Sequence, residues 1–114
     1  MNKFNNKTLE RYSRQIIMEK VGIEGQEKIM NTSISIIGCG GLGTTAAQYL
    51  TMSGIGEILL VDDDSVCLSN LNRQTLFSEK DLGRNKAEVL KKSLKKINPK
   101  SKLISQASRI NKRN

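Results

Sequence analysis

The chain has 114 residues, of which 37% are apolar and 26% are charged, a composition that fits one small domain with a modest core. It holds no run of about 18 apolar residues, so we expect no membrane-spanning segment, and its polar N-terminus lacks the apolar core of a secretory signal. Its two cysteines, Cys39 and Cys67, form no CxxC pair and fit a reducing compartment, so we expect a cytoplasmic protein.

The net charge of +8 is unevenly distributed along the chain. Residues 83–114 hold eleven Lys or Arg against one Glu, whereas residues 1–82 hold eight against ten acidic residues. A basic third of a chain can attract polyanions. However, neither Tyr nor Phe occurs after Phe77 and the chain has no Trp, so the stacking of bases has no support. We interpret the basic residues as a solvated helix face followed by a tail, and expect no nucleic-acid partner.

The first part of the chain, residues 1–32, is predicted to be a helical segment. Its main element is a helix over 8–20, with Thr8 as the N-cap, and a shorter helix is expected near 26–30.

A strand, a helix and a second strand are predicted next. The β-branched run at 34–37 stops at Gly38 and indicates a buried strand. A helix over 43–53 follows and ends at Gly54. The run at 57–62 is a second buried strand. The inward face of the helix is expected to consist of Ala46, Ala47 and Leu50.

The last part of the chain begins with a connection that could hold a turn of helix over 69–77. An amphipathic helix is predicted over 83–97, a third strand over 102–106, and a basic disordered tail over 109–114. The inward face of the helix is expected to consist of Ala87, Leu90, Leu94 and Ile97.

The alternating order of strands and helices predicts an α/β fold with a parallel sheet and right-handed crossovers. We expect a Rossmann-like sheet with helices on both faces, truncated after about three strands. Residues 33–108 would form this partial nucleotide-binding domain.

A glycine cluster, G-C-G-G-L-G at 38–43, joins the first predicted strand to the helix after it. In such a loop Gly38 allows a tight turn, and Gly40 and Gly41 let backbone N–H groups approach phosphate oxygens. Gly43 lets the helix pack closely on the strand. The motif is weak by itself, because a glycine-rich turn can also serve packing alone.

Asp62 ends the second predicted strand, 24 residues after Gly38, where a carboxylate can accept hydrogen bonds from both hydroxyls of a ribose. This spacing suits NAD and ATP equally. We interpret the two carboxylates that follow, Asp63 and Asp64, as surface groups of a loop.

Polar and basic side chains follow at the same edge of the sheet. The S-N-L-N-R-Q stretch at 69–74 carries Asn70, Arg73 and Gln74, and Lys86 lies at the start of the next helix. A dehydrogenase needs such cations only for the 2′-phosphate of NADP. An enzyme that cleaves between the α- and β-phosphates needs them, because charge develops on the leaving pyrophosphate.

Five stretches of the sequence together resemble the ATP-binding half of the ThiF/MoeB/HesA family, the bacterial relatives of the ubiquitin-activating enzymes. They are RYSRQI at 11–16, GCGGLG at 38–43, DDD at 62–64, SNLNRQ at 69–74 and GRNKAE at 83–88. The resemblance implies ATP- and magnesium-dependent adenylation of the C-terminal glycine of a ubiquitin-like sulfur-carrier protein, as in molybdopterin or thiamine biosynthesis.

The resemblance also implies roles for individual residues. The catalytic residues would be Arg14, Arg73 and Lys86. The nucleotide-binding residues would be Gly38, Gly40, Gly41, Gly43, Asp62, Ser69, Asn70 and Gln74. Arg14 resembles the arginine that reaches the ATP of a neighbouring subunit, so we expect a homodimer or a complementing second half.

Two parts of the family pattern are absent from the sequence. The T-D-N-like stretch with the magnesium-binding aspartate does not occur, and neither do the CxxC pairs of the family's zinc site. We therefore expect the magnesium ligand to come from a missing segment, and interpret the chain as a truncated adenylating domain or a separately encoded front half. The alternatives are an inactive fragment with weak nucleotide binding and an NAD(P)-binding Rossmann module.

Overall fold

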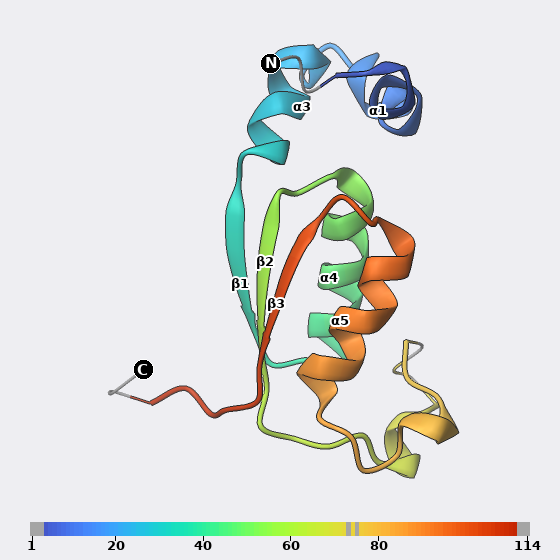
Figure 1. Cartoon of the computed structure of the whole chain (residues 1–114), viewed down its shortest axis with the longest axis vertical. Helices are drawn as coiled ribbons and strands as arrows, with labels where there is room; N and C mark the ends of the chain where they lie inside the picture. Colours follow the sequence, from blue (N-terminus) through green and yellow to red (C-terminus); the bar gives the residue numbers. More distant parts are fainter. Residues whose placement is uncertain (1–3, 73, 75, 112–114) are drawn as a thin grey trace.

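A computed structural model describes residues 4–72, 74 and 76–111, and Figure 1 shows their arrangement. The helices and strands, in chain order, are α1 (Asn6–Arg11), α2 (Ser13–Ile16), α3 (Gly22–Met30), β1 (Ser33–Ile37), α4 (Gly41–Ser53), β2 (Glu57–Val61), the 3₁₀ turns η1 (Leu68–Asn70) and η2 (Glu79–Asp81), α5 (Lys86–Ile97) and β3 (Lys102–Gln106). The predicted α/β, Rossmann-like fold is confirmed.

The three strands form one parallel sheet in the order β1-β2-β3. Its buried face carries an aligned row of apolar side chains, with Ile34 opposite Ile58 and Ile58 opposite Leu103. These side chains pack with the inward faces of α4 and α5, where Leu90 and Leu94 are fully buried. Burial of a Leu side chain contributes about 1.5 to 3 kcal/mol, so this layer is the main source of the domain's stability.

The expectation of helices on both faces of the sheet is wrong for the described residues. Both α4 and α5 lie on the same face (Figure 1). The reason is topological: each crossover moves the chain one strand onward in the same direction, and two right-handed crossovers of this kind place both helices on one side. The opposite face therefore exposes apolar side chains, among them Ile37 (59% exposed) and Ile104 (38%).

The ends of several predicted elements differ in the structure. The helix expected over 8–20 is two short helices, and its N-cap is Asn5, whose Oδ1 accepts from the N–H of Thr8 (2.9 Å). On α4, Ala47 is buried but Ala46 is exposed, because only the former faces the sheet. In the tail expected over 109–114, no regular element is assigned to 109–111, and 112–114 lie outside the described residues.

The N-terminal helices pack against the C-terminal ends of α4 and α5. The Asn98 side chain at the end of α5 donates through Nδ2 to Tyr12 Oη (2.8 Å) and to the Thr51 carbonyl oxygen (3.0 Å). Gln26 Nε2 donates to the Ser53 carbonyl oxygen (2.9 Å). These bonds fix the N-terminal segment at the end of the sheet where the strands begin (Figure 1). None of the described helices is both long and apolar enough to cross a bilayer.

Position 54, the C-cap of α4, accepts only glycine, both because of its backbone conformation and because of the side chains around it. Its φ is +96°, in the left-handed region, and an added Cβ would lie 2.7 Å from the Tyr12 ring. We expect Gly54→Ala to lower the free energy of unfolding by about 2 to 4 kcal/mol, through backbone strain and overpacking. Urea unfolding at fixed protein concentration measures this.

The matched control is Gly25→Ala, within α3, where φ is not positive and the nearest contact of a Cβ is 3.4 Å away. We expect this variant to be unchanged or up to about 1 kcal/mol more stable, because Ala favours helices over Gly. Equal losses in both variants would contradict the role given to Gly54.

The exposed apolar face of the sheet leads us to expect that the chain is not a stable monomer. It should dimerise, aggregate or require a partner that covers this face, because exposed strand surfaces and edges promote association. Light scattering at micromolar concentration, with a denaturant melt alongside, measures this. We expect Ile37→Thr with Ile104→Thr to reduce association more than the control Ile110→Thr, whose side chain is exposed outside the sheet. A monodisperse wild-type monomer with one cooperative transition would show the expectation to be wrong.

Candidate functional site

Two of the predicted loop glycines are required by the fold itself. Gly38 has a φ of +96°, and its N–H donates to the Val61 carbonyl oxygen (2.8 Å), so the chain turns sharply at the end of β1. A Cβ on Gly43 would overlap the carbonyl oxygen of Gly38. These two positions therefore bring α4 into close contact with the turn, and packing alone explains them.

The other two loop glycines are not explained by packing. Among the described residues, a Cβ on Gly41 would meet nothing within 4 Å, and a Cβ on Gly40 would meet only Gln74 Nε2, at 4.0 Å. Neither has a positive φ. Gly40, the N-cap of α4, has no side chain to bond the N–H groups of the first turn. Its carbonyl oxygen accepts from the N–H of Thr44 (2.9 Å). Open space thus faces N–H groups of the first turn, which is the geometry that admits a phosphate.

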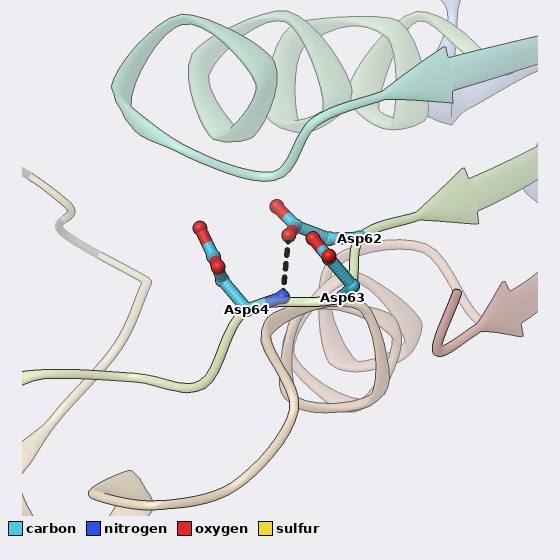
Figure 2. A group of neighbouring side chains, drawn as sticks. All are labelled: Asp62, Asp63 and Asp64. Carbon is cyan, nitrogen blue, oxygen red and sulfur yellow. Dashed lines mark hydrogen bonds between the residues drawn. The ribbon is translucent and has the colours of Figure 1, made fainter. Parts of the chain in front are cut away.

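Asp62 bonds both the glycine loop and the segment after β2, and Figure 2 shows the second of these bonds. Its Oδ2 accepts from the N–H of Cys39 (2.6 Å) and its Oδ1 from the N–H of Asp64 (2.8 Å). Each carboxylate oxygen can accept more than one hydrogen bond, so both retain capacity for a ribose hydroxyl. The predicted position of Asp62, beside the loop at the carboxyl end of the sheet, agrees with the structure.

The carboxylates of Asp62, Asp63 and Asp64 lie close together, with one oxygen of each within 4.8 Å of the others (Figure 2). Such a group has the hard oxygen ligands that a divalent cation prefers. Asp63 and Asp64 are exposed, as expected of loop carboxylates. Exposed acidic groups commonly lie this close together without binding a metal.

Lys86 is the first residue of α5 and is only 7% exposed. Its backbone N–H donates to the Asp64 carbonyl oxygen (2.9 Å), and the preceding Asn85 donates through Nδ2 to the Asp62 carbonyl oxygen (2.8 Å). In the part of the chain that the structure describes, the Lys86 ammonium group has no hydrogen bond or ion pair. The ammonium group at the end of this largely buried side chain is therefore available to an anionic ligand.

The charges of Lys86 and Asp62 both affect the pKa of Cys39, so both groups lie near this residue of the glycine loop. The pKa of the buried Cys39 thiol is raised to about 12, chiefly by burial and further by the Asp62 carboxylate, while the Lys86 ammonium opposes the rise. The thiol is therefore protonated near neutral pH and is not a nucleophile. Its N–H, which bonds Asp62, is the part that contributes to the site.

Gln74 is 3% exposed, and its amide lies next to the loop, as its distance from Gly40 shows. Its Oε1 is buried and has no hydrogen-bond partner among the described residues. The backbone N–H of Gln74 donates to the carbonyl oxygen of Asn70 (3.0 Å). Asn70, in η1, is half-buried, and Ser69 beside it is exposed. Gln74 thus presents an unused acceptor close to the loop.

Of the predicted catalytic residues, one is not described by the structure and another does not lie at the loop. Arg73 lies outside the described residues. Arg14 is exposed on α2, which lies with the N-terminal helices at the C-terminal end of α4. The glycine loop is at the other end of this 13-residue helix, about 20 Å away. Arg14 therefore does not reach the loop of its own chain.

Asn85 is a residue of the site that was not predicted. Besides its bond to Asp62, its Oδ1 accepts from the N–H of Glu88 (3.1 Å) as the N-cap of α5. The sequence contains a signal for it, since Asn followed three residues later by Glu before an apolar face is typical of a helix start.

Known proteins resemble this chain in both sequence and fold. The sequence matches the ThiF family over residues 12–114. It is 43% identical over 106 residues to the sulfur carrier protein ThiS adenylyltransferase of Escherichia coli K12, covering 93% of this chain and 42% of that protein. It is 42% identical over 106 residues to the SAMP-activating enzyme E1 of Haloferax volcanii, covering 93% and 39%.

Among solved structures, that of E. coli MccB with ATP superimposes with a TM-score of 0.82 and 42% sequence identity, over 95% of this chain and 32% of that one. The chain thus spans less than half the length of these relatives. The matched region contains the glycine loop, Asp62 and Lys86. The chain belongs to the ThiF family.

Proposed function

We propose that the chain is the nucleotide-binding portion of an ATP-dependent adenylyltransferase, and that it activates the C-terminal glycine of a ubiquitin-like sulfur-carrier protein. The observation that carries the proposal is Lys86, whose largely buried side chain lies beside the glycine loop and Asp62 and whose ammonium group has no ion pair among the described residues. An enzyme that breaks a phosphate chain needs a cation there, whereas a nicotinamide-binding module has no use for it unless the ligand carries a 2′-phosphate.

Each part of the nucleotide has a candidate partner. The ribose hydroxyls would donate to the Asp62 carboxylate, and the phosphates would accept from N–H groups at Gly41 and the first turn of α4. Lys86 would contact the phosphates, and the free Oε1 of Gln74 would accept from a donor on the ligand or its water shell. Ser69, Asn70 and Arg73 are proposed to complete the site, with Arg14 supplied by a second subunit.

The proposed reaction is a substitution at the α-phosphorus. A carboxylate oxygen of the carrier's last glycine forms a bond to this phosphorus, the bond to the bridging oxygen breaks, and pyrophosphate leaves with the electron pair. Lys86, together with Arg73, would stabilise the charge that develops on the leaving group. Magnesium would neutralise phosphate charge when bound, and we propose that its ligand comes from a segment outside this chain.

The proposed substrate class rests on the names of relatives. The E. coli relative acts on the sulfur carrier protein ThiS and the H. volcanii relative activates SAMP. Because this chain covers well under half of each, the segment that contacts the carrier is proposed to lie outside it.

The nucleotide preference is testable by isothermal titration calorimetry with ATP and NAD. We expect ATP to bind more tightly, with an affinity no better than the high micromolar range, about −5 to −6 kcal/mol, because a magnesium ligand is missing. Lys86→Met should weaken ATP binding about tenfold through the loss of one charge-assisted contact. Tighter binding of NAD would contradict the proposed chemistry.

A second pair of variants tests the glycine loop in the same titration. Gly41→Ala should retain the stability of the fold, because its Cβ meets no protein atom, but should weaken ATP binding by occupying the space for phosphate. Gly25→Ala, in a helix at the other end of the molecule, should leave ATP binding unchanged. Unchanged binding by Gly41→Ala would show that the loop does not hold the phosphates.

We expect that the chain alone does not catalyse ATP–pyrophosphate exchange with a carrier protein, because the magnesium ligand and the uncovered face of the sheet require additional polypeptide. The measurement is incorporation of labelled pyrophosphate into ATP, with Arg73→Ala as the control for enzyme-dependent signal. Exchange above background that Arg73→Ala abolishes would show that the chain is active without the rest of the domain.

A further inference from the structure

A groove separate from the nucleotide site runs along α5. Its volume is about 440 Å³, and it lies between the outer side of α5 and the segment from Leu76 to Arg84. Figure 1 shows this segment beside the N-terminal half of α5. The hydroxyl of Ser93 holds the two walls together by donating to the Leu76 carbonyl oxygen (3.2 Å). No residue of the glycine loop, nor Asp62, lines it.

The walls of the groove carry four cations, Lys80, Arg84, Lys92 and Lys96, all of them exposed. Asp81 is the one carboxylate among the described residues that line the groove, and it already accepts from the N–H and the hydroxyl of Ser78 (2.9 and 3.1 Å). Glu88 lies at the adjoining rim. Among the described residues none of the four cations forms an ion pair, so the groove has an excess of positive charge that is not compensated by its own chain.

The floor of the groove determines which polyanion fits. Leu76 and the buried Val89 supply apolar surface between the charged walls, and the described residues that line the groove include no aromatic side chain. Nucleic-acid sites on such basic surfaces usually add aromatic side chains on which bases stack. An acidic peptide with an apolar side chain matches both the walls and the floor, because carboxylates can pair with the rims while the apolar group is buried.

We propose that this groove is a docking site for an acidic segment of a partner protein, with an apolar side chain at its centre. The lining positions of α5 run from Val89 to Lys96, about 10 Å along the helix, which corresponds to three or four residues of extended peptide. The groove opens next to Arg84, two residues before Lys86. A partner bound there therefore lies beside the nucleotide site without using any of its residues.

The test uses the full chain and a fluorescein-labelled pentapeptide with four glutamates around one central leucine, followed by fluorescence anisotropy at low ionic strength. We expect Lys92→Gln with Lys96→Gln to weaken binding about tenfold, through the loss of two partly exposed charge pairs. The matched control, Lys91→Gln with Lys100→Gln, removes the same charge from exposed positions outside the groove and should change binding less than about twofold. A second variant on the opposite wall, Lys80→Gln with Arg84→Gln, should repeat the loss.

The peptide and its competitors supply the remaining outcomes. A peptide with glutamine in place of glutamate should not bind, and one with alanine in place of leucine should bind several-fold more weakly. Absence of binding by the wild-type chain, or equal losses in the groove and control variants, would overturn the proposal. A thymidine pentanucleotide that displaces the peptide more effectively than unlabelled peptide does would assign the groove to nucleic acid instead.

Discussion

The pair of hydrogen bonds accepted by the Asp62 carboxylate is the interaction on which the candidate site depends. One comes from the Cys39 N–H in the glycine loop and the other from the Asp64 N–H in the segment after β2. Together they fix the first turn of α4 relative to the end of β2. Asn85 then binds the Asp62 carbonyl oxygen and brings the start of α5, with Lys86, to the same place. The carboxylate that orients two loops is also the group proposed to bind the ribose, so its loss would disturb the loops and the proposed binding together.

The sequence was sufficient to predict the order and type of the elements, because their signals are local. The β-branched run before Gly38, the left-handed stop at Gly54 and the apolar spacing of α5 each depend on a few neighbouring residues, and each lies in the predicted type of element. The expectation that the first strand is buried is wrong, because β1 lies at the edge of the sheet and is half-buried on one face and exposed on the other. The single-face packing of α4 and α5 could have been derived as well, since it follows from strand order and handedness. Helices on both faces are a property of complete doubly wound sheets, in which the strand order reverses.

The sequence does not show which loop glycines are needed for packing and which face open space. It also does not show which polar side chains are buried or lack a hydrogen bond. Gly43 is excluded from carrying a side chain by the Gly38 carbonyl, whereas Gly41 faces open space, and only the backbone geometry separates these cases. Likewise the burial of Lys86 and the unused acceptor of Gln74 depend on contacts between segments far apart in the chain. The contribution of Arg73 remains a prediction, as does that of Arg14 from a second subunit.

The position of β1 at the edge of the sheet has a thermodynamic consequence. The glycine loop leaves the carboxyl end of this edge strand, so a nucleotide there has β2 on one side and no strand of the described chain on the other. A strand added beside β1 would form the second wall of the crevice, at the point where doubly wound sheets reverse their strand order. A ligand that contacts both walls would then stabilise the assembled sheet, and by reciprocity the added strand would tighten ligand binding by the same factor. Addition of the strand and binding of the nucleotide would thus be thermodynamically coupled.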